Sequence, residues 1–319
     1  MELLEDNLAL IAGVANDKSI AWAIAQAVHL QGARVVMSYQ NDALGKRVIP
    51  LAESIGARAI PCDFTKSEEV DALFMRIAEM EIPLRYAVHS IAFSKKEELN
   101  GNFLDVSDEN FDVTMRVSCL SFITMVKHCA SFMLDNYKVS GERGSIVGLT
   151  YGASERPHPH YNIMSVAKAA LGSAMRNAAF QLGPDGIRTN LVSPSPEDTL
   201  SARGIKGFRH IGRWADGMSM LGRRVTLEEI AETVVFLLSG WASGITAQTI
   251  MVDGGASVSG MPPLRHARII GQDMMAIADE VEGVRPSTSR GQYLDHSGEV
   301  EGEGDDVVDE LKGSSTPGA

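Results

Sequence analysis

The chain has 319 residues, a formal net charge of −12, 45% hydrophobic residues and 6% aromatic residues. This is the composition of a globular protein with a sizeable core, and the negative charge argues against nucleic acid as a partner. The acidic start of the chain lacks the basic residues of an export signal, and no continuous apolar run predicts membrane insertion. The three cysteines Cys62, Cys119 and Cys129 have no metal-ligand spacing, which favours reduced thiols and a cytoplasmic location.

Short β-branched runs alternate with amphipathic segments along the first 260 residues. We expect strands at 7–12, 33–39, 57–62, 85–91, 144–150, 187–193 and 247–253. We expect helices at 19–31, 42–55, 67–80, 107–136, 161–182 and 226–239. This order predicts a single Rossmann-like, doubly wound α/β domain, in which helices cover both faces of a seven-stranded parallel sheet. A ligand crevice is then expected at the carboxyl ends of the strands.

Residues 261–319 differ in composition from this domain. They contain twelve acidic and five basic residues, a balance of −7, which leaves −5 for residues 1–260. Few large apolar residues follow Ala278, so this segment buries too little surface to offset its ordering entropy. We therefore expect a domain at 1–260 and an acidic, largely disordered extension at 261–319, with one short helix near 271–282.

The first strand leads into the turn Gly13-Val14-Ala15-Asn16-Asp17-Lys18-Ser19-Ile20-Ala21. Gly13 permits a tight turn, and Ser19 with the following amides begins a helix that can face phosphates. The segment is not the usual G-x-G-x-x-G, so a plain turn and a nucleotide-binding turn both remain open.

The next three strands also end in residues that suit a dinucleotide. Gln40 can hydrogen-bond an adenosine ribose, and positions 40 and 41 carry no basic residue for a 2′-phosphate. Asp63 can accept from the adenine amine, and Phe64 can flank the ring. The fourth strand ends in residues beside which a nicotinamide ribose can lie: Ser90, Ile91 and Ala92. The four strand ends together favour NAD as cofactor, with NADPH less favoured.

Tyr161 and Lys168 are seven positions apart, which is two turns of a helix, and Tyr151 lies ten positions upstream. A phenol close to a lysine is a suitable donor to a developing oxyanion, because the cation makes the phenol more acidic. For this pair alone, chance placement on an amphipathic helix remains an alternative. The dinucleotide pattern upstream favours the functional interpretation.

The segment 199–222 fits neither a strand nor a simple crossover helix and is expected to be a substrate lid. Residues 199–224 contain the single acid Asp216 and six basic residues: Arg203, Lys206, Arg209, Arg213, Arg223 and Arg224. A basic field on an acidic protein suits an acidic partner, although a solvated helix face would look the same. His158 and His160 lie on a proline-rich loop without a third ligand, so no metal site is expected.

Over residues 7–260 the chain resembles the short-chain dehydrogenase/reductases and, within them, the bacterial NADH-dependent enoyl-acyl-carrier-protein reductases. The resemblance rests on the Gly13–Ala21 turn, on Tyr39–Asp42, Cys62–Asp63 and His89–Ile91, and on the spacing of Tyr151, Tyr161 and Lys168. Most of the superfamily has Tyr-x3-Lys and a serine thirteen residues before the tyrosine. Here these positions hold Ser165 and Gly148, which argues against carbonyl reduction of the common kind.

The resemblance implies reduction of trans-2-enoyl thioesters on acyl carrier protein by NADH, in fatty acid biosynthesis, by a homotetramer. It makes Tyr161 the donor to the thioester oxygen, Lys168 the partner of the nicotinamide ribose, and Tyr151 either an aid to protonation or part of the pocket wall. It adds Ser94 to Tyr151 and Tyr161 as substrate-binding residues. The cofactor residues that it implies are Gly13, Ser19, Ile20, Gln40, Asp63, Phe64, Ser90, Ile91, Ala92, Lys168, Glu197, Thr199 and Leu200.

One loop departs from the family pattern. The family has Ser-Ala-Gly-Pro-Ile-Arg-Thr-Leu where this chain has Ser193-Pro194-Ser195-Pro196-Glu197-Asp198-Thr199-Leu200. Two carboxylates near a diphosphate are unfavourable unless they point to solvent. Two alternatives to the enoyl reductase therefore remain: a short-chain reductase homologue for another enone or carbonyl, and a catalytically impaired binding homologue.

Overall fold

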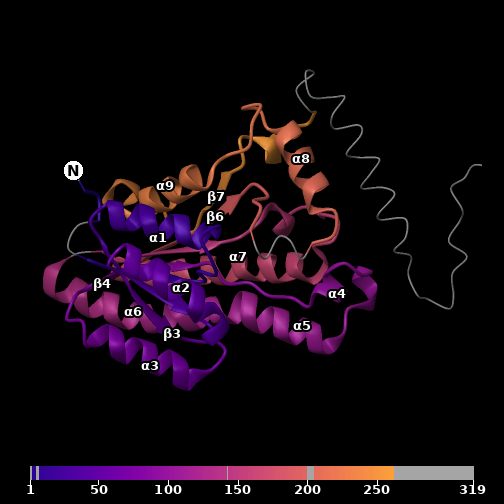
Figure 1. Cartoon of the computed structure of the whole chain (residues 1–319). Coiled ribbons are helices and arrows are strands. Elements are labelled where there is room, and N and C mark those ends of the chain that lie inside the picture. Colours follow the sequence, from indigo (N-terminus) through magenta and orange to yellow (C-terminus); the bar gives the residue numbers. More distant parts are fainter. Residues whose placement is uncertain (1, 5–6, 142, 200–204, 262–319) are drawn as a thin grey trace, which may run out of the picture. The chain divides into compact units, whose positions relative to one another are not determined.

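The computed structural model describes residues 2–4, 7–141, 143–199 and 205–261, and their centre is a seven-stranded parallel sheet (Figure 1). The strand order is β3-β2-β1-β4-β5-β6-β7, with every neighbouring pair parallel. The strands are β1 (Leu8–Ala12), β2 (Arg34–Tyr39), β3 (Arg58–Pro61), β4 (Leu84–His89), β5 (Ser145–Leu149), β6 (Arg188–Pro194) and β7 (Thr249–Val252).

Helices connect successive strands and continue around the site. They are α1 (Ile20–Leu30), α2 (Asp42–Ser54), α3 (Ser67–Ala78), α4 (Lys96–Leu99), α5 (Asp108–Met115), α6 (Ser121–Ser140), α7 (Asn162–Leu182), α8 (Phe208–Met218) and α9 (Leu227–Leu238). A π-helical turn, η2 (Arg116–Leu120), joins α5 to α6. Short 3₁₀ turns lie at η1 (Phe103–Asp105), η3 (Gly152–Ser154), η4 (Gly183–Asp185), η6 (Gly240–Ala242) and η7 (Ala256–Val258).

Helices cover both faces of the sheet, which explains why the central strand β1 is apolar at every position. Along β1, Ala9 and Ile11 belong to a core cluster that contains residues of α1, α2 and α9. Leu8 and Leu10 point to the opposite face and belong to a second cluster with residues of α3, α6 and α7. The strand order changes direction between β1 and β4, and such a switch point opens a crevice at the carboxyl ends of the strands.

The structure confirms the predicted fold class and the seven strands, with boundaries that differ by one or two residues. The segment expected as a lid without regular structure contains α8 in its described part. The sequence did not predict this helix because α8 includes Gly212 and Gly217, and glycine disfavours helices. Gly212 is needed for packing, since a Cβ at this position would lie 2.7 Å from an Arg224 nitrogen. The helix expected at 271–282 and the disorder expected at 283–319 lie outside the described residues.

The segment Asp108–Lys138 is long and apolar enough to cross a membrane by length and composition alone. Of its most apolar stretch, 56% is buried inside the fold. Phe122, Met125 and Cys129 of α6 are fully buried in the core cluster beneath the sheet. Packing within the domain therefore accounts for the apolar composition, and the absence of membrane insertion remains a prediction.

Arg188, at the start of β6, binds the end of α9 inside the protein. Its guanidinium donates to the carbonyl oxygens of Leu237 (2.7 Å), Ser239 (3.0 Å) and Ile245 (3.1 Å). The last carbonyls of a helix lack intrahelical partners, so a buried helix end needs such donors. Burial lowers the pKa of Arg188 to about 10, which still leaves the group cationic at neutral pH.

We predict that Arg188→Met lowers the free energy of unfolding by about 2–4 kcal/mol, because buried carbonyls of α9 lose a charged donor. Chemical denaturation followed by circular dichroism measures this loss. The exposed Arg76 of α3 provides the control, and Arg76→Met should change stability by less than about 0.5 kcal/mol. Equal stability of the two variants would contradict the role of Arg188.

Candidate active site

A cavity of about 540 Å³ lies along the carboxyl ends of the strands. Residues that follow β1, β2, β3, β4, β5 and β6 line it, together with residues of α7 and α8. Every residue predicted for cofactor, substrate or catalysis lines this cavity except Leu200, which lies outside the described residues. The structure thus brings together residues that are up to 186 positions apart in sequence, from Gly13 to Thr199.

The turn after β1 passes very close to the end of β4. Gly13 has φ of +103°, and a Cβ at this position would lie 2.1 Å from the Ser90 carbonyl oxygen. The Ser19 hydroxyl donates to the Asn16 carbonyl (2.7 Å) and closes the turn just before α1 begins. The first amides of α1 therefore face the cavity region as an anion site of the kind that binds a diphosphate.

The residues after β2 and β3 form the far end of the cavity. Gln40 donates from Nε2 to Asp63 (3.1 Å), and the Thr65 amide and hydroxyl both donate to the same carboxylate. Burial acts to raise the pKa of Asp63, but the bonds from Thr65 and Gln40 outweigh it and hold the pKa below its ordinary value. An ionised Asp63 thus lies beside Gln40, and a ribose 2′-phosphate there would meet negative charge.

The loop after β4 is fixed by the π-helical turn η2, which the sequence did not reveal. The Ser118 hydroxyl accepts from the Phe93 amide (3.0 Å) and donates to the Phe93 carbonyl (3.2 Å). Ser121 donates to the Val117 carbonyl, so His89 must be the donor in the 2.8 Å contact between its Nε2 and Ser121 Oγ. Val117 and Ser121 both line the cavity. The wider turn therefore shapes the cavity wall, a common use of π-helical turns.

Tyr151 and Tyr161 lie against each other in the cavity wall, with ring centroids 5.0 Å apart. The Tyr151 hydroxyl lies 3.3 Å from Nδ1 of His158, a residue to which the sequence gave no role here. Tyr161 is the N-cap residue of α7, one residue before the helix begins, with a helical backbone conformation (φ −106°, ψ −21°). Tyr161 and Lys168 both line the cavity. Burial raises the pKa of both phenols, which corrects the expectation that lysine makes Tyr161 more acidic.

Lys168 lies on α7 and is 5% exposed. Its ammonium donates to the Leu149 carbonyl (2.8 Å) at the end of β5, and this bond fixes the amine at the cavity wall. Burial lowers the pKa of Lys168 to about 8, with a smaller opposing effect from Cys119. The amine is therefore held ready to donate to hydroxyl groups of a ligand.

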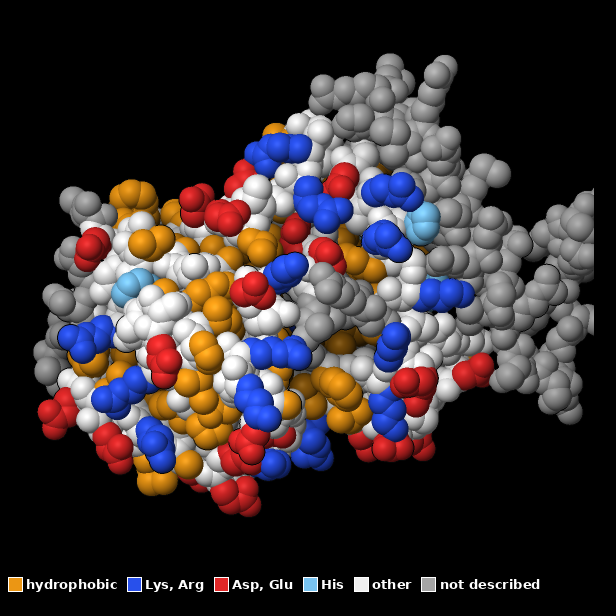
Figure 2. Space-filling model, viewed as in Figure 1, with side chains coloured by type: hydrophobic (Ala, Val, Ile, Leu, Met, Phe, Trp, Pro, Cys, Tyr) orange, Lys and Arg blue, Asp and Glu red, His pale blue; other side chains and the backbone are white. Residues whose placement is uncertain are grey.

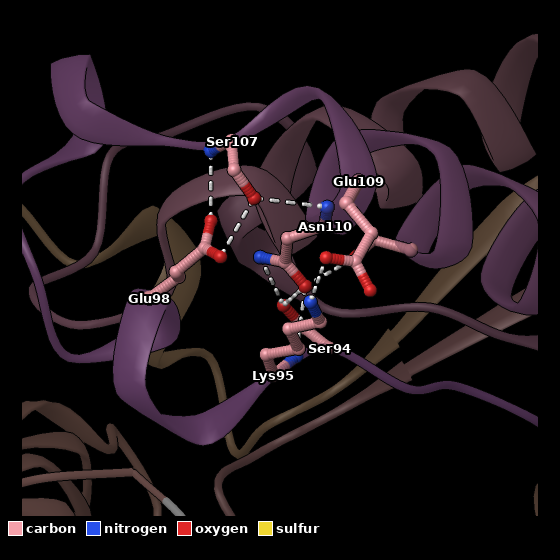
Figure 3. A network of polar contacts seen from close by, with 7 residues as sticks. Ser94, Lys95, Glu98, Ser107, Glu109 and Asn110 are labelled. Carbon is pink, nitrogen blue, oxygen red and sulfur yellow. Dashed lines mark hydrogen bonds and ion pairs between the residues drawn. The ribbon is translucent and has the colours of Figure 1, made fainter.

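Ser94 belongs to a polar network that holds the segment around α4 (Figure 3). Its hydroxyl contacts the buried Asn110 amide group, which also accepts from the Lys95 amide (2.9 Å). Glu98 accepts from both the amide and the hydroxyl of Ser107 (2.8 and 2.7 Å). The network gives Ser94 a defined place in the cavity wall.

The α4 segment and α7 are also tied together. Asn162 donates to the carbonyls of Glu98 (3.0 Å) and Gly101 (2.7 Å) while its own backbone has φ of +34°. Tyr161 and Ser94 are therefore held by one connected framework.

The loop after β6 brings an acid into the wall. Glu197 and Thr199 line the cavity, and the Ser195 hydroxyl donates to Glu197 (2.8 Å). Burial raises the pKa of Glu197 to about 7, against smaller lowering effects of Ser195 and Arg224. Asp198 is exposed, whereas Glu197 is half-buried in the cavity wall, so the unfavourable effect expected for a carboxylate near a diphosphate concerns Glu197.

Basic side chains gather around α8 beside the cavity (Figure 2). Arg224 binds both oxygens of Asp216 (2.8 Å each), and Arg223 binds Glu229 (2.6 and 2.9 Å). Lys206, Arg209 and Arg213 are exposed, whereas Arg203 lies outside the described residues. Ile205, Phe208 and Ile211 line the cavity from the same segment, so its entrance is apolar inside and basic outside.

A family model described as enoyl-(acyl carrier protein) reductase matches residues 13–257. The chain belongs to this family. It is 42% identical over 260 residues to an NADH enoyl-[acyl-carrier-protein] reductase of Rhizobium meliloti, which covers 81% of this chain and 93% of that protein. The FabI structure from Candidatus Liberibacter asiaticus has a TM-score of 0.78 and 40% identity, over 82% of this chain and all of that one. The Anaplasma phagocytophilum reductase, solved in complex with NAD, has a TM-score of 0.77 and 41% identity, over 82% of this chain and 98% of that one.

The residues of this family member fit the NADH of its relatives. Gly13 leaves open a cradle that any Cβ would close, and Gln40 and Asp63 offer neutral and anionic acceptors where adenosine would lie. Lys168 and Tyr161 line the same cavity, and the Lys168 ammonium is held at the end of β5. These groups would hold the diphosphate, the adenosine and the nicotinamide ribose, respectively.

We predict that Gly13→Ala abolishes detectable NADH binding and lowers the free energy of unfolding by about 2–4 kcal/mol, because β1 and β4 must move apart. NADH fluorescence and chemical denaturation measure the two effects. Gly56 is the matched control, since it has φ of +66° and nothing within 4 Å of an added Cβ. Gly56→Ala should cost only about 1–2 kcal/mol of backbone strain and leave NADH affinity unchanged. NADH binding that survives in Gly13→Ala would contradict this account of the turn.

Proposed function

We propose that the protein reduces the trans-2 double bond of enoyl-acyl-carrier-protein thioesters with NADH, as a step of fatty acid biosynthesis. The observation that carries the proposal is one continuous cavity that contains both a dinucleotide cradle at Gly13 and the side chains of the half-buried Tyr161 and the buried Lys168. Bound NADH supplies the hydride for the β-carbon of the enoyl group. The remaining steps rest on the side chains of the chain itself.

Tyr161 is the proposed donor to the thioester oxygen. Reduction at the β-carbon of a conjugated thioester places negative charge on that oxygen. Burial raises the pKa of Tyr161, so the phenol keeps its proton at neutral pH and can donate it in a hydrogen bond as the charge forms. A donor of this kind typically contributes about 3–4 kcal/mol to the transition state.

Lys168 is the proposed partner of the nicotinamide ribose, because its bond to the Leu149 carbonyl leaves further N–H donors for ligand hydroxyls. Its charge also stabilises negative charge that develops nearby. Tyr151 and Ser94 are proposed to line the thioester end. The 3.3 Å contact between Tyr151 and His158 supports a role for Tyr151 in proton delivery to the α-carbon.

Acyl carrier protein is the proposed macromolecular partner. The exposed Lys206, Arg209 and Arg213 surround an entrance whose inner wall includes Ile205 and Phe208. Such a surface suits an acidic carrier that delivers an apolar chain, and opposite charges raise the rate of encounter.

Three further proposals concern the whole chain. The family match at 13–257 supports a reductase domain at 1–260 with a separate extension at 261–319. Homotetramer formation is proposed from family resemblance. A cytoplasmic location is proposed, and the free, buried Cys62, Cys119 and Cys129 support it.

The direct test is NADH oxidation at 340 nm with a trans-2-enoyl thioester carried by acyl carrier protein. We expect turnover of the enoyl thioester and none of a simple ketone. The exposed Lys138→Ala variant on α6 serves as a control that retains full activity. NADH binding without enoyl reduction would leave the two alternatives, of which turnover of another enone or a ketone would favour the reductase homologue and no turnover the binding homologue.

We predict that Tyr161→Phe lowers kcat about 100- to 1000-fold and leaves NADH affinity nearly unchanged, because only the donor to the oxyanion is lost. Lys168→Ala should lower kcat and weaken NADH binding together. Steady-state kinetics and NADH fluorescence titration separate these effects. An equal loss of NADH affinity in the two variants would contradict the assigned roles.

A further inference from the structure

The loop that follows β6 is held so that Glu197 faces the cavity. Pro194 and Pro196 restrict the backbone on both sides of Ser195, whose amide donates to the Val252 carbonyl (3.0 Å) of β7. The Thr199 amide donates to the Glu197 carbonyl (2.7 Å) and closes the turn. The loop therefore restrains the backbone at Glu197, and the hydrogen bond from the Ser195 hydroxyl holds its carboxyl group.

The surroundings of this carboxyl contain little to compensate its charge. Ser195 donates to one of its oxygens (2.8 Å), and within the described parts of the chain no lysine or arginine forms an ion pair with it. Arg224 acts to lower the pKa of Glu197, but its guanidinium is bound by both oxygens of Asp216. Asp216 itself opposes a second negative charge at Glu197.

These facts favour a carboxyl that changes protonation near neutral pH. Burial raises the pKa of Glu197 to about 7, Asp216 adds to the rise, and Ser195 and Arg224 oppose it. The other titratable groups of the cavity wall are Tyr39, Cys62, Asp63, Lys96, Tyr151, His158, Tyr161 and Lys168, and the neighbouring Asp198 is exposed. The pKa of Asp63 lies below its ordinary value, so this carboxyl stays ionised over pH 6–8. Burial lowers the pKa of His158, which favours its neutral form, and lowers the pKa of Lys168 to about 8, at the upper edge of this range.

We propose that the dinucleotide binds to the form of this protein in which Glu197 is protonated, so that binding takes up a proton at neutral pH. The diphosphate brings negative charge into the cavity that Glu197 lines, and this charge favours the neutral carboxyl. The neutral carboxyl also gains an O–H that can donate to an oxygen of the ligand. The inference rests on the proposed function, since it requires NADH to occupy this cavity.

The sign of the effect follows from proton linkage. The bound state holds more protons than the free state over the range where free Glu197 is ionised, so the Kd for NADH rises with pH through about 7. From pH 6 to pH 8 we expect the Kd of the full-length protein to rise about five- to tenfold. Titration calorimetry at pH 7 in buffers of different ionisation enthalpy should show uptake of a fraction of one proton for each NADH.

Glu197→Gln should make the Kd constant within about twofold over this range and abolish the proton uptake. The matched control is Asp198→Asn, which removes the adjacent exposed carboxyl and should retain the full pH dependence. Ser195→Ala gives a second, graded test, because loss of the donated hydrogen bond should move the midpoint of the Kd curve to higher pH. Thermal unfolding establishes that the variants are folded.

The outcomes separate this inference from the proposed function. A Kd that is independent of pH, or an unchanged slope in Glu197→Gln, overturns the inference while NADH binding itself stands. Absence of NADH binding at every pH overturns both. Proton uptake that disappears in Glu197→Gln and persists in Asp198→Asn establishes the coupling.

Discussion

The close approach of β1 and β4 is the constraint on which the site depends. At the switch point the Gly13 backbone passes so near the Ser90 carbonyl that no side chain fits between them. This approach places the start of α1 and the end of β4 on one wall of the cavity. Two sequence-distant segments can then contact the same ligand, one at its phosphates and the other beside its reactive end.

Burial sets the charge states along this cavity, and it acts differently at each group. Burial keeps the Tyr161 phenol protonated. It also lowers the pKa of Lys168, whose ammonium donates a hydrogen bond to the Leu149 carbonyl. At Asp63 three donated hydrogen bonds outweigh burial, so this carboxyl stays ionised. Glu197 receives one such bond from the described residues, from Ser195, and its pKa is near neutrality. Two carboxyl groups in one cavity therefore have different pKa values, because burial is offset by hydrogen bonds to a different extent at each.

The sequence predicted the strands and the cavity residues well, because apolar runs and strand-end residues are local signals. It did not predict α8, in which Gly212 packs closely against Arg224. It also missed Ser118 and Ser121, because their partners Phe93 and His89 are 25 and 32 residues away in the chain. The contact between His158 and Tyr151 joins residues only seven positions apart, but a lone histidine on a loop carries no pattern that indicates it. The prediction that Tyr161 is more acidic than an ordinary tyrosine was wrong, because the spacing of Tyr161 and Lys168 does not indicate how deeply the phenol is buried.

The π-helical turn η2 limits the deletions that the continuous helical segment from α5 to α6 can tolerate. This turn accommodates one more residue than an α-helical turn would, and the extra residue lets Ser118 reach Phe93 while Ser121 reaches His89. Deletion of one residue here would restore a regular helix but rotate one half of it by about 100° relative to the other. Either the buried face of α6 or the contacts of α5 would then turn away from their partners. Substitutions in this stretch act on single contacts, whereas a one-residue deletion changes the alignment of the whole helix.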